Sequence, residues 1–455
     1  MIDPYYLPAF MFLTMAVLLL TGYPVAMVLG GVGLAFGFIG YFLDVFRLIE
    51  FFNLMPRIWG GIADNMVLVA VPMFIFMGTV LERSGVAEKL LYCLQVLLRR
   101  VPGALALAVT GMGTIMAAST GIIGASVVMM SLLALPAMLH WRYDMAMASG
   151  TVAASGTLGI LLPPSIMLVI MAEMMGLSVG RIFMAAIFPG LILAGLYVLY
   201  IGLRAGFNPA LAPPLDKAEG PQTALALAGL VVTSFVPPLA LMFLVLGSII
   251  FGWATVTEAS AVGAAGALVL AALNRRLSWA TLKDTVQRAA LTNAMVFFVL
   301  VGATAFAYVF RSLGGDFMVE DMIEAFGLGT WGTLLVLVAI VFFLGFFFEW
   351  IEITLIVLPI FLPMLALLDF GEHVGTHREV VLWFAILMAV NLQTSFLTPP
   401  FGFALFYMKG VAPPEVKMQT IYRGIIPFVL LQLLGLGLVI AFPQLALWLP
   451  EAVLG

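Results

Sequence analysis

Long apolar segments recur along the whole chain and restrict its fold more than any other feature of the sequence. Only 9% of the 455 residues are charged and 64% are hydrophobic, whereas about 25% of the residues of a soluble domain are charged. A crossing of the bilayer needs about 20 apolar residues, fewer at its wet ends. The segments that span on this criterion are residues 8–20, which reach that length only with residues 4–7, and residues 24–43, 65–81, 178–204, 224–251, 256–273, 291–310 and 421–442. The sequence therefore predicts an all-α polytopic membrane protein, because β-barrel strands would be shorter segments of alternating polarity.

The charged residues, histidines and cysteine exclude several classes of function. The chain carries 19 basic and 23 acidic residues, and the net charge of −4 provides no basic surface for nucleic acid. Cys93 is the only cysteine, and the three histidines stand at loop ends without partners for a zinc site. The sequence has no phosphate-binding Gly-Lys-Ser/Thr loop and no Gly-x-Ser-x-Gly nucleophile motif. We therefore expect no ATP hydrolysis, no enzymatic activity and no bound cofactor.

Four apolar stretches are interrupted in the middle by small, hydroxylated or acidic residues. The interruptions fall at residues 119–121, 156–164, 348–352 and 393–400. Irregular backbone is tolerated at membrane depth only where protein buries it or where it lines a wet cavity. Small residues also let membrane helices approach closely, so packing alone explains a single interruption. Four interruptions at matching positions favour a functional site.

The interruptions are duplicated along the chain. Residues 156–164 align with 392–400, Leu135-Pro136 with Leu362-Pro363, and 77–85 with 306–314, in the same order. The first pair of segments ends in two prolines each, and prolines lack the amide donor that a helix needs. The alignment predicts a first repeat at 1–207, a linker at 208–222 and a second repeat at 223–455. The first repeat would contain a re-entrant hairpin at about 103–140 and a broken helix at about 143–175. The second repeat would contain a re-entrant hairpin at about 330–368 and a broken helix at about 380–410.

The order of elements predicts that the two repeats are inverted in the membrane. Each repeat would contain two helices, an in-plane amphipathic segment (45–62 or 278–290), a third helix, the hairpin, the broken helix and a final helix. If each hairpin enters and leaves on one side, the number of crossings per repeat is odd, and an odd number inverts the second repeat. Both termini then share a face. Placing them outside leaves most of the 19 Lys and Arg residues inside, as the positive-inside rule requires.

The interruptions expose backbone carbonyl and amide groups together with side-chain oxygens. Helix N-termini at such breaks attract anionic groups, and uncharged oxygens are ligands for Na⁺. The candidate ion- or substrate-binding residues of the first repeat are Ser119, Thr120, Ser155, Gly156, Thr157 and Gly159. Those of the second repeat are Thr354, Asn391, Gln393, Thr394, Ser395 and Thr398. The pattern does not separate ion ligands from substrate ligands.

Two glutamates stand at the expected tip of the second hairpin. Glu349 and Glu352 interrupt an apolar stretch, and acidic residues inside a membrane are costly and usually functional. A helix would place them on one face, because they are three residues apart. Three roles stay open for this pair: attraction of a cation, a structural hydrogen bond to a neighbouring break, and coupling to a proton.

Three motifs resemble the large membrane subunit of the tripartite ATP-independent periplasmic (TRAP) transporters, the DctM-like or M subunit. They are residues 154–165, residues 391–402 and the helix start Thr257-Glu258-Ala259, and the resemblance covers nearly the whole chain. The resemblance implies a symporter in the bacterial inner membrane that takes up an organic acid together with Na⁺. It also implies an elevator mechanism, in which a transport domain moves against a fixed scaffold. It also implies two protein partners, a small four-helix (Q-type) membrane subunit and a periplasmic substrate-binding protein, besides membrane lipid.

The hairpin tips of the family match this sequence only in part. The first tip of the family usually carries a run of serines with one glycine, so Ser119 and Thr120 inherit that role here. The second tip usually has one acidic residue followed by threonines, and both Glu349 and Glu352 are available for that position. The resemblance therefore leaves open which glutamate acts at the tip.

A stand-alone Na⁺/carboxylate carrier of related inverted-repeat architecture is the alternative function. The two hypotheses differ in whether uptake needs partner proteins. A membrane-embedded enzyme or redox subunit would need a nucleophile with its base, haem-binding histidines or a metal set within the spans, and no such set is recognisable. Substrate specificity is expected largely in the binding protein, which is another chain.

Overall fold

Helices account for the regular secondary structure in the part of the chain that the structure describes. The computed structural model describes residues 3–120, 123–215, 220–221, 223–366, 368–399 and 402–454. Among these residues, seven helices are long and apolar enough to cross a membrane, or eight if a bent pair at residues 48–83 counts as one span. The predicted all-α polytopic fold is therefore confirmed.

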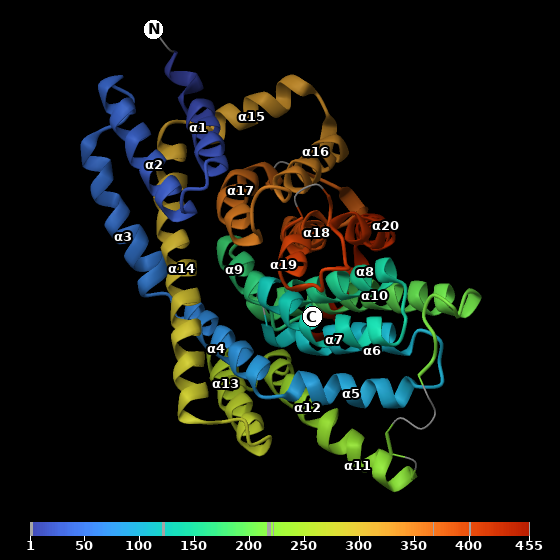
Figure 1. Ribbon diagram of the computed structural model, residues 1–455. Helices are drawn as coiled ribbons and strands as arrows, with labels where there is room; N and C mark the ends of the chain where they lie inside the picture. Colours follow the sequence, from blue (N-terminus) through green and yellow to red (C-terminus); the bar gives the residue numbers. More distant parts are fainter. Residues whose placement is uncertain are drawn as a thin grey trace.

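The helices form two groups, which we call the frame and the bundle (Figure 1). The frame comprises α1 (Leu7–Leu20), α2 (Val25–Phe42), α3 (Leu54–Ile58), α4 (Ala70–Arg83), α11 (Ala224–Ser234), α12 (Val236–Ile250), α13 (Val256–Leu273), α14 (Trp279–Ser312) and α15 (Gly315–Phe326). The bundle comprises α6 (Ala104–Thr120), α7 (Ile123–His140), α8 (Met145–Thr157), α9 (Ile166–Met174), α10 (Val179–Phe207), α16 (Gly329–Leu344), α17 (Trp350–Leu365), α18 (His377–Ser395), α19 (Phe403–Val411), α20 (Met418–Ala441) and α21 (Gln444–Leu454). Helix α5 (Val86–Leu98) contacts α4, α6 and α11.

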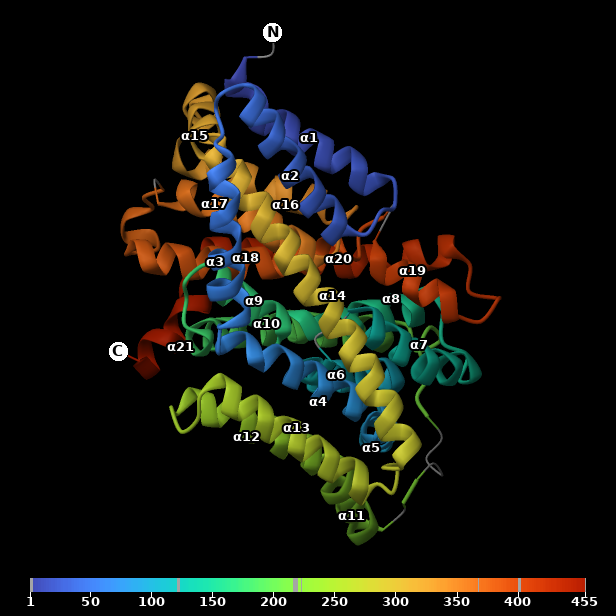
Figure 2. The ribbon, with the colours of Figure 1, turned by 90° about the vertical axis from the view of Figure 1, so that its left-hand side faces the viewer.

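Within the frame, each half of the chain packs a long helix against a helix of the other half. Helix α14 packs along α2, α4 packs along α13, and α4 also contacts α14 (Figure 2). The contact between α2 and α14 is close because it uses glycines: a Cβ atom on Gly302 would overlap the carbonyl of Ala26, and one on Gly33 would crowd Ala305. This reciprocal pairing is what two related repeats, interlocked in one frame, produce.

The two halves differ at the segments that the sequence analysis expects in the membrane plane. A separate segment was predicted at 278–290, but α14 continues without interruption from Trp279 to Ser312. The prediction was wrong because no glycine or proline stands between residues 279 and 301, so nothing ends the helix. In the first half the chain bends by 56° between residues 48–63 and 67–83. Asn65 lies at this bend, and its side chain accepts a hydrogen bond from the amide of Val67 at 3.0 Å.

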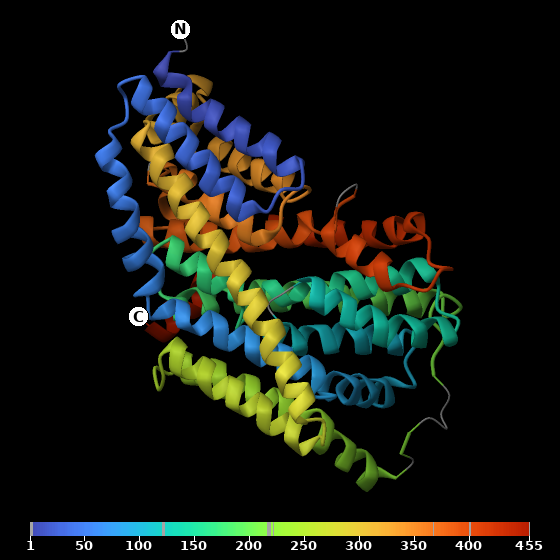
Figure 3. The same cartoon turned by 60° about the vertical axis from the view of Figure 1, so that its left-hand side comes forward.

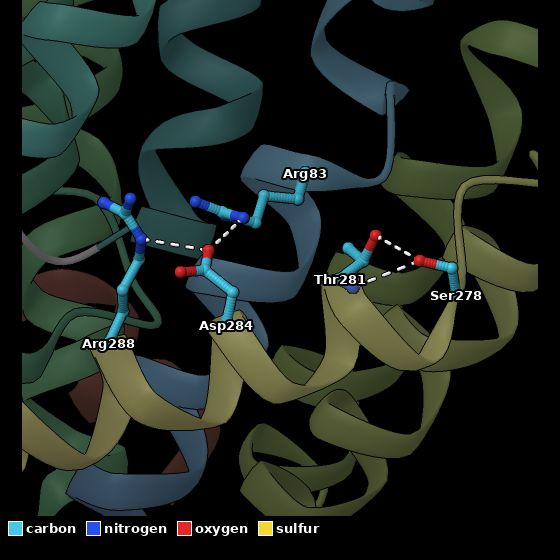
Figure 4. A network of polar contacts seen from close by, with 5 residues as sticks. All are labelled: Arg83, Ser278, Thr281, Asp284 and Arg288. Carbon is cyan, nitrogen blue, oxygen red and sulfur yellow. Dashed lines mark hydrogen bonds and ion pairs between the residues drawn. The ribbon is translucent and has the colours of Figure 1, made fainter.

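An ion-pair cluster fixes the first turns of α14 against the end of α4 (Figure 4). Asp284 pairs with Arg288 on the next turn at 3.1 Å and with Arg83 at the end of α4. Ser278 caps the start of α14 by accepting a hydrogen bond from the amide of Thr281 at 3.1 Å. The charged side chains are between 32% and 64% exposed, so each pair contributes at most about 1 kcal/mol and mainly sets the position of the helix.

In the bundle, α8 and α18 are buried along most of their length and carry the residues of the candidate site. Figure 3 shows the bundle helices running side by side, with both ends of the chain on the left of the view. Helix α20 packs directly on α8. A Cβ atom on Gly424 would overlap the carbonyl of Ala146, and one on Gly150 would overlap the carbonyl of Gly424. The two backbones therefore touch without intervening side chains.

We expect Gly424→Ala to destabilise the protein. The added methyl group would overlap the carbonyl of Ala146, so α8 and α20 must separate, and such overpacking costs about 1–3 kcal/mol. Gly437→Ala on the same helix is the control, because no atom lies within 4 Å of its Cβ position. The measurement is the apparent melting temperature of the purified protein in detergent. Equal melting temperatures for the two variants would contradict the close contact.

Candidate functional site

The first broken helix consists of α8, a short irregular segment and α9. Every residue from Met147 to Thr157 is buried, and a 3₁₀ turn at Leu158–Ile160 follows the end of α8. Helix α9 begins at Ile166, after Pro163-Pro164. The prolines provide no amide donors, so the helical hydrogen bonds stop there. The hydroxyl of Ser165 instead donates to the carbonyl of Ile160 at 2.6 Å, which satisfies one of the freed groups.

The second broken helix repeats this arrangement with α18 and α19. Every residue from Val380 to Ser395 is buried, and α18 ends at Ser395. Helix α19 begins at Phe403. Pro400 and Phe401, which belong to the motif of this break, lie outside the described residues. Both predicted breaks therefore fall where a long buried helix ends.

A hydrogen bond joins the ends of the two buried helices. The Nε2 atom of Gln393 donates to the Oγ1 atom of Thr157 at 3.4 Å, and both side chains are 0% exposed. The two residues are 236 positions apart, which is the offset that aligns the two breaks in the sequence. They stand at equivalent positions of the two aligned breaks, and each break contributes one polar side chain to this buried contact.

Most hydroxyl groups at the breaks donate to a carbonyl of their own helix. Such bonds, to the residue three or four positions earlier, are common for Ser and Thr in helices. They use the hydroxyl hydrogen and leave oxygen lone pairs free to accept a hydrogen bond or to bind a cation. The bonds are Thr157 to Ala154 at 2.9 Å, Thr394 to Val390 at 3.0 Å, Ser395 to Leu392 at 2.9 Å and Thr398 to Thr394 at 2.8 Å.

Three further oxygen atoms on α17 and α18 are buried and have no hydrogen-bond partner among the described residues. They are Oε1 of Gln393, Oδ1 of Asn391 and Oγ1 of Thr354, on side chains that are at most 1% exposed. The amide nitrogen of Asn391 donates to the carbonyl of Val338 at 2.7 Å, which orients its oxygen. An unsatisfied buried group costs about 1–3 kcal/mol, so such atoms point to a bound ion or water. All three are uncharged oxygens, the donor type that suits Na⁺ at a broken helix.

Several predicted site residues of the first repeat contribute to helix packing, and the side chains of two others lie outside the described residues. The hydroxyl of Ser155 donates to Thr110 on α6 at 3.2 Å. Gly156 lets α7 approach, because a Cβ atom there would overlap Val127, and Gly159 is buried in the 3₁₀ turn. The first hairpin tip separates α6 from α7, and the side chains of Ser119 and Thr120 lie outside the described residues. The tip of the first hairpin therefore stays a prediction.

The second hairpin tip places both glutamates close together. Glu349 precedes α17, and the carboxylate of Glu352 accepts a hydrogen bond from the amide of Glu349 at 3.1 Å. The carboxylate of Glu349 accepts a hydrogen bond from the hydroxyl of Tyr407 on α19 at 3.0 Å. Of the three roles left open by the sequence, the structure thus shows a hydrogen-bonding role for each glutamate. The bond of Glu349 joins the second hairpin to α19, the second half of the second broken helix.

Tyr407 is a site residue that the sequence analysis did not identify. Besides its bond to Glu349, its ring lies against Gly124 near the start of α7, where a Cβ atom would come within 3.1 Å of the ring. The side chain therefore contacts both hairpins at once. No local signal marks it, because its role depends on where α19 packs against α7.

Two buried broken helices at the centre of a many-helix membrane fold are the architecture of a secondary transporter. The family model described as the DctM component of the tripartite ATP-independent periplasmic transporter matches residues 12–445. The chain belongs to this family, and it is a large permease subunit of a TRAP-type secondary transporter.

Two relatives agree with this assignment, and one solved structure has a similar fold. The C4-dicarboxylate TRAP transporter large permease protein DctM of Pseudomonas aeruginosa is 30% identical over 394 residues, which cover 86% of this chain and 87% of that protein. The ectoine/5-hydroxyectoine TRAP transporter large permease protein UehC of Ruegeria pomeroyi is 29% identical over 448 residues, which cover 97% and 98%. The YdaH transporter of Alcanivorax borkumensis has a similar fold, with a TM-score of 0.62, 16% identity and coverage of 90% of this chain and 91% of that chain.

We expect Tyr407→Phe and Glu349→Gln to destabilise the protein non-additively. Phenylalanine at position 407 keeps the ring against Gly124 but removes the hydroxyl that donates the hydrogen bond. Glutamine at position 349 removes the carboxylate charge that accepts this bond. A hydrogen bond to a charged group contributes about 1.5–3 kcal/mol, and partial exposure of Tyr407 reduces the expected coupling to about 1 kcal/mol. Apparent melting temperatures of both single variants and the double variant measure it. Tyr92→Phe is the control on an exposed tyrosine, and additive effects would contradict the bond.

Proposed function

We propose that this large permease subunit transports Na⁺ and an organic acid together, with the two broken helices as the binding centre. Two observations carry the proposal: the contact between Gln393 and Thr157, and three buried oxygens on α17 and α18 without partners among the described residues. Uncharged oxygens bind a hard cation without placing a permanent charge inside the membrane. The proposed Na⁺ ligands are the predicted oxygen donors at the breaks and tips, with Thr354, Asn391 and Gln393 foremost among the described side chains.

The same centre would bind the carboxylate of the organic acid weakly. No Lys or Arg stands in the four interrupted segments, so backbone amides, helix N-termini and side-chain amides are the groups left to bind an anion. A weak site suffices when a binding protein delivers the substrate, because effective concentrations in such assemblies reach about 1 mM. The two relatives are named for different substrates at 30% and 29% identity, so overall identity does not assign the acid.

The division into frame and bundle supports an elevator mechanism, in which the bundle moves against the frame. The frame is held together by the reciprocal pairing of α2 with α14 and of α4 with α13, whereas α4 and α14 contact the bundle through α6, α9 and α17. The 56° bend before α4 would serve as a hinge. Asn65 at this bend donates a hydrogen bond to Glu173 near the end of α9, which connects the hinge to the bundle.

The proposed location is the bacterial inner membrane, with both termini in the periplasm. The distribution of Lys and Arg favours the periplasm for both termini. Membership of the tripartite family supports the two partners, a small four-helix membrane subunit and a periplasmic substrate-binding protein. The stand-alone Na⁺/carboxylate carrier is the alternative function, and it differs from the tripartite system in taking up substrate without partner proteins.

Thr354→Val is expected to weaken sodium binding without loosening the fold. Valine has a similar shape, and removal of an unpaired buried hydroxyl by itself is neutral or stabilising. If the oxygen binds Na⁺, the sodium concentration for half-maximal thermal stabilisation, with choline replacing sodium, should rise about tenfold, or about 1.4 kcal/mol. Thr151→Val is the matched control, because the Thr151 hydroxyl is likewise buried without a partner among the described residues but lies in the middle of α8, before the break that follows Thr157. An unchanged sodium dependence in Thr354→Val would place the ion elsewhere.

Uptake is expected to require both partner proteins. The chain alone offers a centre without Lys or Arg, so it should take up little labelled organic acid in vesicles with a sodium gradient. Adding the small membrane subunit and the loaded binding protein should restore uptake. The measurement is accumulation of labelled acid with each component omitted in turn and with sodium replaced by choline as the control. Saturable uptake by this chain alone would establish the stand-alone carrier instead.

A further inference from the structure

A cavity of about 410 Å³ lies between the frame and the second hairpin. Helix α14 contacts both α3 and α17 (Figure 2), and residues from all three helices line the cavity together with Met174 at the end of α9. Two arginines face it, Arg57 from α3 and Arg311 from α14, and none of the lining residues is acidic. The cavity thus combines two positive charges with otherwise apolar and weakly polar walls.

Both guanidinium groups keep unused hydrogen-bond donors. Arg57 lies over the ring of Tyr308, 4.8 Å from its centroid, and no carboxylate forms an ion pair with it among the described residues. Arg311 donates one hydrogen bond to the carbonyl of Pro359 at 2.7 Å and lies 3.6 Å from Asp316, which is not a lining residue. Each guanidinium has five N–H donors in a planar fork that fits a carboxylate or a phosphate.

The cavity borders the candidate site. Leu355 and Pro359 of α17 line it, and the residue before Leu355 is Thr354, whose buried hydroxyl has no partner among the described residues. Met174 belongs to α9, the second half of the first broken helix. An anion in the cavity would therefore lie next to the second hairpin and the first broken helix, on the boundary between frame and bundle.

We propose that this cavity is an anion-binding vestibule in which Arg57 and Arg311 bind a carboxylate or phosphate group. The proposal rests on the function proposed above and extends it, because it gives an organic acid a charged binding position outside the breaks, which have no arginine. The phosphate of an anionic lipid has the same chemistry and reaches the same place, since Arg57 and Gly61 on the cavity wall are exposed. The experiment below separates these two sources.

Protection of a cysteine in the cavity tests the proposal on the full chain in nanodiscs. Gly61 lines the cavity, and no atom lies within 4 Å of its Cβ position, so Gly61→Cys adds a thiol without a clash. Gly60→Cys is the matched control, with an equally free Cβ position outside the lining. Both are made in a Cys93→Ala background, which removes the only native cysteine. The rate of reaction with an uncharged maleimide is measured at constant sodium and constant ionic strength.

Succinate is the probe for a free organic acid. At about 10 mM it should slow the labelling of Gly61→Cys about tenfold, as expected for a dissociation constant of about 1 mM, and leave Gly60→Cys unchanged. Arg57→Gln should abolish this protection, and Arg311→Gln should weaken it. Arg378→Gln is the charge control, because it removes an exposed arginine that does not line the cavity.

The lipid composition of the nanodisc distinguishes the acid from the lipid. Protection by succinate in phosphatidylcholine nanodiscs supports binding of the free acid. Protection already present in phosphatidylglycerol nanodiscs without succinate, and lost in Arg57→Gln, supports binding of the lipid phosphate. Equal labelling of Gly61→Cys under all conditions overturns the proposal. The assay uses neither a sodium gradient nor partner proteins, so its failure is distinguishable from a failure of the assembled system to transport.

Discussion

A helix that is interrupted inside an apolar bundle frees backbone groups, and the need to cover them organises this structure. An uncompensated buried polar group costs several kcal/mol in a surrounding without water. Ser165 meets part of this requirement, because its hydroxyl donates to the carbonyl of Ile160, and α6, α7 and α20 pack closely around α8. Glycines such as Gly150 and Gly156 allow this close packing, because a side chain at either position would overlap a neighbouring helix.

The two halves meet the same requirement with different residues. Thr157 and Gln393 are equivalent in the repeats, yet one is a short hydroxyl that bonds its own helix and the other a long amide that reaches across. The frame shows a similar difference, since α14 is one continuous helix and the corresponding part of the first half bends by 56°. A duplicated fold thus explains where the two breaks meet, while the local sequence sets which side chains make the contact.

The breaks could be predicted from the sequence because their causes are local. Proline pairs and runs of small polar residues end a helix wherever they stand, and α8 and α18 do end within the predicted stretches. The continuity of α14 was mispredicted because a change from amphipathic to apolar sequence alters what surrounds a helix but not its hydrogen bonds. Tyr407 and Arg57 could not be identified, because their roles depend on contacts with Glu349 and with the α14 wall, which are distant in sequence.

The placement of charge links the ion to the acid in the proposed mechanism. Uncharged oxygens occupy the buried centre, the carboxylate of Glu349 lies at a hairpin tip where Tyr407 bonds it, and the two arginines stand at the frame boundary. A carboxylate that moved from the boundary to the centre would leave the guanidinium groups behind. Only helix dipoles and amides would then offset its charge, unless a cation occupied the oxygens beside it. Under this proposal Na⁺ supplies the missing positive charge, so the coupling of ion and acid follows from the absence of arginine at the centre.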